Sequence, residues 1–277
     1  MKQNGGVMSF AGSTALVTGA SKGIGAAYAR ELASRGADVV LVARSADTLE
    51  RLAEELRSAH GVRVEVIAAD LSDRDGPCQV DDELRRRGIE VDLLVNNAGA
   101  GSIGPFFERP FDAQLANVDL NITGLVTLTH RLGARMRERG GGGIINLSST
   151  AAFQPLAYQA VYAATKAFVL SFSEALAEEL AGTGVRVMAA HPGAVATGFL
   201  DGTTAKISHA ADSPATIAAR TLDDFARGRH ASYPGSWFYR VQTWAGRVLP
   251  RRRAAALGAV LNRKLGFDHV SDVEPAR

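Results

Sequence analysis

Short apolar runs that alternate with helix-compatible stretches constrain the fold of this chain more than any other feature. Residues 38–43 contain the uninterrupted run Val39-Val40-Leu41-Val42, which is typical of a strand buried on both faces of a parallel sheet. Helix formers follow at residues 46–60. The alternation predicts an α/β fold, a Rossmann-type doubly wound parallel sheet flanked by helices. The other apolar runs lie at residues 14–17, 62–68, 93–95, 144–147 and 185–190.

The composition limits the classes to which the chain can belong. With 277 residues, 46% of them hydrophobic and 22% charged, it suits one large globular domain and not a disordered or fibrous protein. The net charge of +2 gives no indication of a nucleic-acid partner. Cys78 is the single cysteine, so we expect no internal disulfide, no metal site and a reducing, cytoplasmic location. No signal peptide and no run of about 20 apolar residues is present, which predicts a protein that does not span a membrane.

A glycine-rich segment joins the first predicted strand to the first predicted helix, at residues 26–34. Glycine permits a tight turn and lets a pyrophosphate approach the backbone, while unpaired amides at the helix start face the anion. The spacing G-x-x-x-G-x-G is looser than the usual dinucleotide fingerprint, and a plain tight turn is the alternative. The segment comprises Thr18, Gly19, Ala20, Ser21, Lys22, Gly23, Ile24 and Gly25.

Arg44, at the end of the second predicted strand, indicates which dinucleotide binds. An acidic residue there would hydrogen-bond the ribose 2′-hydroxyl of NAD. A cation favours the 2′-phosphate of NADP, and Lys22 could supply a second charge to the same group. We therefore predict NADP(H) in preference to NAD(H). The alternative is that Arg44 and Lys22 are ordinary solvated surface cations.

Tyr162 and Lys166 stand four residues apart at the start of a predicted helix that runs to about residue 180, so they share one helix face. A free phenol has a pKa near 10, and a neighbouring ammonium favours the phenolate. The pair therefore suits acid–base chemistry. Without further context, a cation lying along a ring on a solvated face is the simpler interpretation.

The context is a predicted strand that ends in Ser148 and Ser149, the latter thirteen residues before Tyr162. With these residues the chain resembles the classical short-chain dehydrogenase/reductase superfamily over residues 13–197. The matching motifs are the glycine-rich segment, Asp70, Asn96-Asn97-Ala98-Gly99, Asn121, Ser149, Tyr162, Lys166, Pro192-Gly193 and Thr197.

The resemblance implies catalytic roles for four residues. Tyr162 would be the general acid in carbonyl reduction and the base in alcohol oxidation. Lys166 would lower the pKa of Tyr162 and hold the nicotinamide ribose, and Ser149, in preference to Ser148, would orient the substrate oxygen. Asn121 would hold a water that connects Lys166 to solvent, unless it is a polar residue satisfied within its helix.

The resemblance also implies contacts with the dinucleotide. Residues 96–99 would border the adenine ribose, Asp70 and Leu71 the adenine, and residues 192–197 the nicotinamide carboxamide. A turn at 96–99 and a helix cap at Asp70 are the simpler alternatives, and we expect His191 to be structural. The implied cofactor-binding set is Gly19, Ser21, Lys22, Gly23, Ile24, Gly25, Arg44, Asp70, Leu71, Asn97, Ala98, Gly99, Tyr162, Lys166, Pro192, Gly193, Val195 and Thr197.

The substrate walls implied by the resemblance are Ile103, Pro105 and Phe106 together with residues 153–158 and 194–211. They are mainly apolar or small, which favours a hydrophobic ketone or alcohol, such as a fatty-acyl or steroid-like carbonyl. The expected activity is NADP-dependent hydride transfer by a homodimer or homotetramer. Two alternatives stay open: a non-catalytic NADPH-binding sensor or scaffold, and a lyase or isomerase that uses the nicotinamide transiently.

We expect residues 1–226 to form the main domain. The chain that follows them has a different composition. Residues 227–264 contain nine Lys or Arg and no Asp or Glu. Apolar residues at helical spacing predict two amphipathic helices separated by Pro250, in a basic C-terminal extension over residues 227–277. This extension could dock on protein, within or between subunits. It could instead contact a membrane surface through Trp237 and Trp244, or bind nucleic acid, which we rank last.

Overall fold

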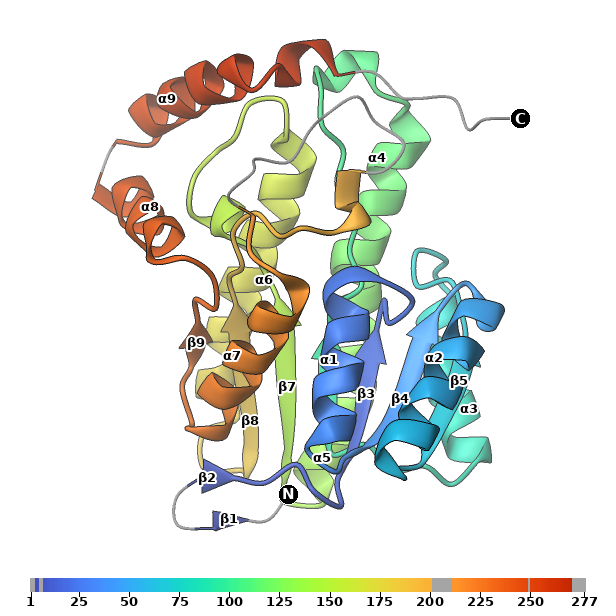
Figure 1. The fold of residues 1–277 in the computed structure, drawn as a ribbon. Helices are drawn as coiled ribbons and strands as arrows, with labels where there is room; N and C mark the ends of the chain where they lie inside the picture. The colour runs from blue at the N-terminus through green and yellow to red at the C-terminus, as the bar shows by residue number, and fades with distance from the viewer. Residues whose placement is uncertain (1–2, 5–6, 201–210, 249, 271–277) are drawn as a thin grey trace.

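A sheet of seven strands, each parallel to its neighbours, lies at the centre of the computed structural model, which describes residues 3–4, 7–200, 211–248 and 250–270 (Figure 1). The strand order is β5-β4-β3-β6-β7-β8-β9. Because the order reverses next to β3, this is the doubly wound sheet predicted from the sequence. The strands are β3 Thr14–Thr18, β4 Asp38–Ala43, β5 Val64–Ala68, β6 Leu93–Asn96, β7 Gly142–Leu147, β8 Val185–Ala190 and β9 Ala231–Ser232.

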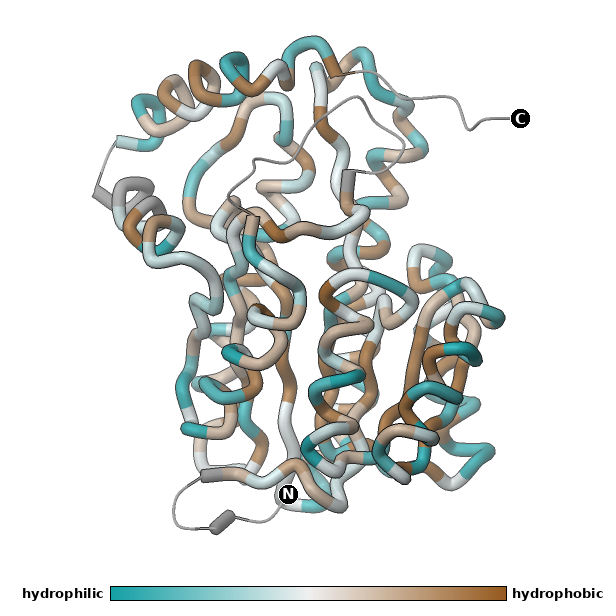
Figure 2. The backbone as a smooth tube through the Cα atoms, in the orientation of Figure 1, coloured by the Kyte–Doolittle hydropathy of each residue, from teal (hydrophilic) through white to brown (hydrophobic). Residues whose placement is uncertain are grey.

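Helices cover both faces of the sheet. One core lies under α1, α2 and α7 and includes Tyr28 and Phe225. The other lies under α3 and α5 and includes Leu84 and Leu132, with Leu176 of α6 packed against it. Figure 2 shows the resulting pattern, with apolar strands inside and many polar residues on the outer helices. The helices are α1 Gly23–Ser34, α2 Ala46–His60, α3 Gly76–Arg86, α4 Phe111–Val118, α5 Leu125–Glu138, α6 Ala160–Glu179 and α7 Pro214–Ala226.

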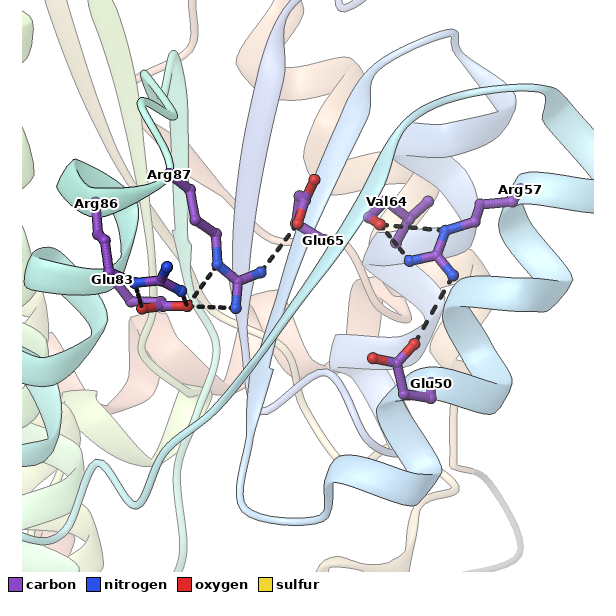
Figure 3. Close-up of polar contacts among 7 residues, drawn as sticks. All are labelled: Glu50, Arg57, Val64, Glu65, Glu83, Arg86 and Arg87. Atoms are coloured by element: carbon purple, nitrogen blue, oxygen red, sulfur yellow. Dashed lines mark hydrogen bonds and ion pairs between the residues drawn. The ribbon is translucent and has the colours of Figure 1, made fainter.

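Arginine side chains fasten the edge strand β5 to the helices on its two faces (Figure 3). Arg57 of α2 donates two hydrogen bonds to the carbonyl oxygen of Val64, at 3.2 and 2.5 Å. Arg87, which follows α3, lies 2.9 Å from Glu65 and also contacts Glu83. The Glu65 carboxylate and the Val64 carbonyl, two polar groups at the sheet edge, thus both have partners.

The C-terminal region combines a strand with two helices. β9 pairs with β8, so the sheet continues past residue 226, where the sequence analysis ended the main domain. A strand of two residues produces no apolar run, and this is why the sequence did not predict it. The same holds for β1 Gln3–Asn4 and β2 Val7–Met8, which form an antiparallel pair.

Two helices follow β9 and confirm the helices predicted there: α8 Trp237–Val248 and α9 Arg251–Lys264. The short helical turns elsewhere are η1 Phe106–Glu108, η3 Thr150–Phe153, η4 Gly198–Leu200 and η5 Phe267–His269. Between α4 and α5, residues Asp119–Gly124 form a π-helical segment, η2. Within the described part of the chain, none of the helices combines the length and apolar character needed to cross a bilayer.

Candidate active site

The glycine-rich segment forms a tight turn between β3 and α1. Gly19 and Gly23 have φ angles of 65° and 59°, in the left-handed region that favours glycine. A Cβ on Gly25 would collide with the carbonyl oxygen of Gly19, and a Cβ on Gly19 would lie 2.9 Å from the Cα of Ala98. Since α1 begins here, the amides of its first turn lack partners in the helix and carry partial positive charge. This open backbone surface fits a pyrophosphate.

The segment after β6 is tied to the glycine turn. Thr18 Oγ1 accepts hydrogen bonds from the amides of Asn97, at 3.0 Å, and Ala98, at 2.9 Å, and Asn97 Nδ2 donates to the carbonyl of Thr18 at 2.9 Å. Gly99 lies further along, where a Cβ would be 3.3 Å from Lys166 Nζ. Residues 97 and 98 thus border the glycine turn, and residue 99 borders the lysine.

The two cations predicted to bind a 2′-phosphate have different protein partners. Arg44 is 79% exposed at its side chain, and its Nη1 lies 3.8 Å from Asp70 Oδ2. Lys22 Nζ donates to the carbonyl of Gly198 in η4 at 3.3 Å. The Arg44 guanidinium is therefore accessible to a phosphate, whereas Lys22 bridges the glycine turn to the loop after β8.

Asp70 forms a turn with Ser72 and does not cap a helix. Its Oδ1 accepts hydrogen bonds from the Ser72 amide at 3.0 Å and hydroxyl at 2.6 Å. These bonds, with a smaller contribution from Arg44, lower the pKa of the Asp70 carboxyl. The neighbouring Leu71 side chain is buried in the core, so it is the backbone of Leu71 that can face an adenine.

A cleft of about 1170 Å³ lies on the helix side of the glycine turn, among α1, α2 and the start of α7. Ser21 lines it, whereas Ile24 packs against the core beneath α1. Neither Arg44 nor Tyr162 is among its lining residues. The cleft borders the glycine turn at Lys22 and Gly23 and the loop after β8 at Thr197.

Tyr162 and Lys166 lie one turn apart on α6, as their spacing predicted. Lys166 Nζ is 5.8 Å from the centroid of the Tyr162 ring and donates to the carbonyl of Leu147 at 2.8 Å. Lys166 is buried, and burial lowers the pKa of its ammonium to about 8 because a low dielectric disfavours the charged form. The lysine is therefore anchored to the end of β7.

Burial also acts on the phenol. It raises the pKa of Tyr162, and a hydrogen bond with Ser149 offsets part of the rise. The sequence predicted the opposite direction, a pKa of Tyr162 lowered by Lys166. The four-residue spacing reveals the neighbouring lysine but not the loss of solvent around the phenol. Ser148 donates to the carbonyl of Lys166 at 2.9 Å, so Ser149 is the hydroxyl placed at the phenol.

Asn121 lies in the π-helical segment η2, a kind of distortion that is frequent at functional sites. Its Nδ2 donates to the carbonyl of Ala100 at 2.8 Å and to Thr165 Oγ1 at 3.0 Å, and its Oδ1 accepts from the Ala100 amide at 3.0 Å. Both amide hydrogens are thus committed to protein groups, and one lone pair of Oδ1 is left to hold a water. The side chain joins α6 to the segment after β6.

The loop after β8 connects several parts of the site. The carbonyl of Pro192 accepts from the amide that begins η3, at 3.1 Å. A Cβ on Gly193 would collide with the ring of Tyr239 in α8. Val195 is buried and forms a bridge to the chain just before α7, and the Thr197 methyl group lies against the glycine turn. His191, at the start of the loop, is buried and packs edge-on against Phe153 and at a tilt against Tyr233.

Phe199 is a site residue that the sequence analysis did not single out. Its ring centroid is 5.3 Å from that of Tyr162, and a Cβ on Gly101 would lie 2.7 Å from the Phe199 ring. The contact depends on the path of a loop, which leaves no local pattern in the sequence. Of the predicted substrate loop at 194–211, residues 201–210 lie outside the described residues.

C-terminal residues hold two other predicted substrate walls. Ile103 is buried in a cluster with Phe267 and Val270, and Tyr158 packs against it. Tyr158 has a φ of 66°, a left-handed conformation that is costly for a tyrosine and is fixed by its surroundings. Phe106, in contrast, is exposed on η1.

Comparison with known proteins agrees with this geometry. Residues 13–208, more than two thirds of the chain, match the short chain dehydrogenase family. The chain belongs to this family. The match extends from the strand before the glycine turn to the loop after β8, and it contains the four predicted catalytic residues. The predicted resemblance and the predicted sheet are thus both confirmed.

Among known short-chain dehydrogenases, three curated relatives show the range of activities. The very-long-chain 3-oxoacyl-CoA reductase of Anas platyrhynchos is 38% identical over 192 residues, which cover 67% of this chain and 61% of that protein. The 17-beta-hydroxysteroid dehydrogenase type 3 of Homo sapiens is 38% identical over 189 residues, 67% of this chain and 60% of that protein. The serine 3-dehydrogenase of Rhizobium radiobacter is 39% identical over 226 residues, which cover 80% of this chain and 88% of that protein. The chain thus spans about three fifths of the length of the first two.

A solved structure bears on the cofactor. The short-chain dehydrogenase from Sphingobium yanoikuyae, in complex with NADPH, superimposes with a TM-score of 0.75 at 33% identity, covering 88% of this chain and 98% of that one. That protein binds NADPH and shares its fold with this chain over most of both lengths.

Proposed function

We propose that this short-chain dehydrogenase is an NADP(H)-dependent oxidoreductase that interconverts a hydrophobic ketone and a secondary alcohol. One observation carries the proposal: Tyr162, Lys166, Ser149 and Asn121 converge at the carboxyl ends of β6 and β7, beside a glycine turn that fits a pyrophosphate. The bound nicotinamide supplies or accepts the hydride. The residues of the chain manage the proton and the substrate oxygen.

In the reducing direction, the Tyr162 hydroxyl would give its proton to the oxygen of the substrate carbonyl, while a bound nicotinamide would supply the hydride to its carbon. A raised pKa keeps Tyr162 protonated and ready as the acid. The Ser149 hydroxyl, hydrogen-bonded to the phenol, donates to the same oxygen and stabilises the negative charge that develops there. In the oxidising direction, Tyr162 takes the alcohol proton.

Lys166 prepares the site for that return step. Its ammonium is fixed by the Leu147 carbonyl and lies near the Tyr162 ring, so a phenolate formed after proton donation is stabilised by a nearby positive charge. With a pKa of about 8, the ammonium is itself able to pass on a proton near neutral pH. The free lone pair of Asn121 Oδ1 offers a place for a water beside it.

The preference for NADP(H) rests on Arg44. The residue follows β4, where an acidic side chain would serve NAD, and its exposed guanidinium can pair with a 2′-phosphate. The NADPH in the Sphingobium yanoikuyae relative supports the same choice.

The substrate class rests on the apolar groups around Tyr162. Phe199 lies against the phenol ring, and Ile103 and Tyr158 are packed in an apolar cluster. The names of two relatives, a very-long-chain 3-oxoacyl-CoA reductase and a 17-beta-hydroxysteroid dehydrogenase, agree with a fatty-acyl or steroid-like carbonyl. The serine 3-dehydrogenase relative represents the polar alternative.

A substrate panel tests this function. NADPH oxidation is followed with 3-oxoacyl-CoA thioesters of increasing chain length and with steroid ketones, and NADP⁺ reduction is followed with serine. Turnover that increases with the apolar size of the substrate supports the proposal. Turnover of serine alone would overturn the substrate class, and NADPH binding without turnover of any substrate would favour the sensor.

The proposal includes self-association as a homodimer or homotetramer. Phe111 and Leu115 on α4 and Phe168 on α6 are exposed, and α4 and α6 pack together, so these apolar side chains are available for contact with a second copy. Sedimentation of the full chain measures the state directly.

A further inference from the structure

The apolar stripe of α8 faces away from the protein. Trp237 and Trp244 are 75% and 62% exposed, and Val241 between them is exposed as well. The opposite side of the helix carries Thr243, which is buried, and Tyr239, which packs on Gly193. The helix is therefore fixed to the site by its polar side and presents its apolar side outward.

The next helix, α9, has the same arrangement. Ala254, Gly258 and Asn262 recur every four residues and are buried. Gly258 lets the helix approach Leu156, and Asn262 Nδ2 donates to the carbonyl of Ala157 at 2.8 Å. The large apolar residues of α9 are exposed, and Figure 2 shows apolar and polar positions alternating along it. We define the outer face as Trp237, Val241, Trp244, Leu257, Val260 and Leu261.

Basic side chains flank this outer face. Arg240 in α8 and Arg251, Arg252, Arg253 and Arg263 in α9 are all exposed. The sequence from residue 227 to 264 contains no acidic residue to neutralise them. An exposed combination of tryptophan, leucine and arginine has the chemistry of a helix that lies in the interface of an anionic bilayer.

We propose that the outer face of α8 and α9 docks on an anionic lipid membrane. The tryptophan and leucine side chains enter the headgroup region, and the arginines pair with lipid phosphates and carboxylates. Charge complementarity favours this occupant over a second copy of the chain. Two copies joined through this face would bring uncompensated arginines together, which is unfavourable.

The position of α9 connects docking with the proposed site. Its inner side holds residues 155–157, part of a predicted substrate wall, through Gly258 and Asn262. Figure 1 places α9 along the upper edge of the molecule and α8 below it at the upper left, both beyond the carboxyl ends of the strands. Docking therefore brings the membrane to the side of the molecule that carries this substrate wall, a link that rests on the proposed function.

The two tryptophans provide a direct test. They are the only ones in the chain, so tryptophan fluorescence reports on α8 alone. The full chain is titrated with vesicles of phosphatidylcholine, with and without phosphatidylserine. We expect a blue shift and co-sedimentation with the anionic vesicles only, both reduced by high salt. An unchanged spectrum and an unbound protein with anionic vesicles would overturn the proposal.

Variants separate the contributions of charge and apolar contact. Because Trp237 and Trp244 are exposed, the double variant Trp237→Ser/Trp244→Ser keeps the fold, which NADPH binding checks, and should co-sediment at least about tenfold less. Arg252→Glu/Arg263→Glu should lose vesicle binding to a similar extent. The control Arg74→Glu/Arg137→Glu makes the same change in net charge at exposed positions outside α8 and α9, and it should bind vesicles like the parent chain. If the tryptophan and the arginine variants bind vesicles as well as the parent does, lipid is not the occupant. The same holds if the parent does not bind vesicles and the tryptophan substitutions dissociate a dimer.

Discussion

The ammonium of Lys166 lies 5.8 Å from the centre of the Tyr162 ring and donates a hydrogen bond to the carbonyl of Leu147. The pair is thus held between α6 and the end of β7, and the phenol is hydrogen-bonded to Ser149. Burial disfavours both ionised forms, so it raises the pKa of the phenol and lowers that of the ammonium. The phenol of Tyr162 therefore stays protonated at neutral pH, as the proposed general acid requires.

Replacing Arg44 should change the choice of cofactor. In Arg44→Ala, we expect the Kd for NADPH to rise by about tenfold or more, since a charge-assisted contact to the 2′-phosphate is lost, and the Kd for NADH to stay the same. Fluorescence titration with both cofactors measures the ratio. Arg74→Ala, which removes an exposed cation from the loop before α3, is the control. Equal weakening of both cofactors would argue against a 2′-phosphate contact.

The buried lysine should leave a signature in the pH dependence of stability. Its pKa is about 8 in the folded protein, against 10.5 for a solvent-exposed lysine, so between these values the unfolded chain binds more protons. Relative to Lys166→Met, the free energy of unfolding of the parent should therefore rise by up to about 3 kcal/mol from pH 8 to about pH 10. Below pH 8, the free-energy curves of the two proteins should run parallel. Urea unfolding across this range measures the difference. Parallel curves throughout would show that the ammonium is not destabilised by burial.

The hydrogen bond from Asn262 to Ala157 should shape the substrate side of the site. In Asn262→Ala, the carbonyl of Ala157 loses a partner, and we expect a loss of about 1 kcal/mol in unfolding free energy and a higher KM for the ketone. The Kd for NADPH should not change. Arg263→Ala, at the exposed neighbouring position, should leave all three quantities unchanged. A higher Kd for NADPH would place the effect on the cofactor side.

Local patterns predicted the parts of this molecule that depend on local physics. The apolar run at residues 39–42 specifies a strand buried on both faces, and the spacing of Tyr162 and Lys166 places them on one side of α6. The glycine turn was predictable because its glycines stand between a strand and a helix.

Contacts between distant segments were not predictable in this way. Phe199 reaches Tyr162, Tyr239 packs on Gly193, and Asn262 holds Ala157 only because loops and C-terminal helices return to the site. The raised pKa of Tyr162 is of the same kind, since solvent exclusion comes from the whole assembly. The exposed side of α8 is likewise set by tertiary contacts, because Tyr239 and Thr243 occupy its inner side.

Tyr162→Phe removes the hydroxyl that we propose transfers the proton. The most direct measurement compares NADPH oxidation by the parent chain and by Tyr162→Phe with the best ketone of the panel, alongside the Kd for NADPH. We expect kcat to fall by at least about 10²-fold in the variant, with the Kd for NADPH retained. Turnover by Tyr162→Phe at a rate close to that of the parent would contradict it.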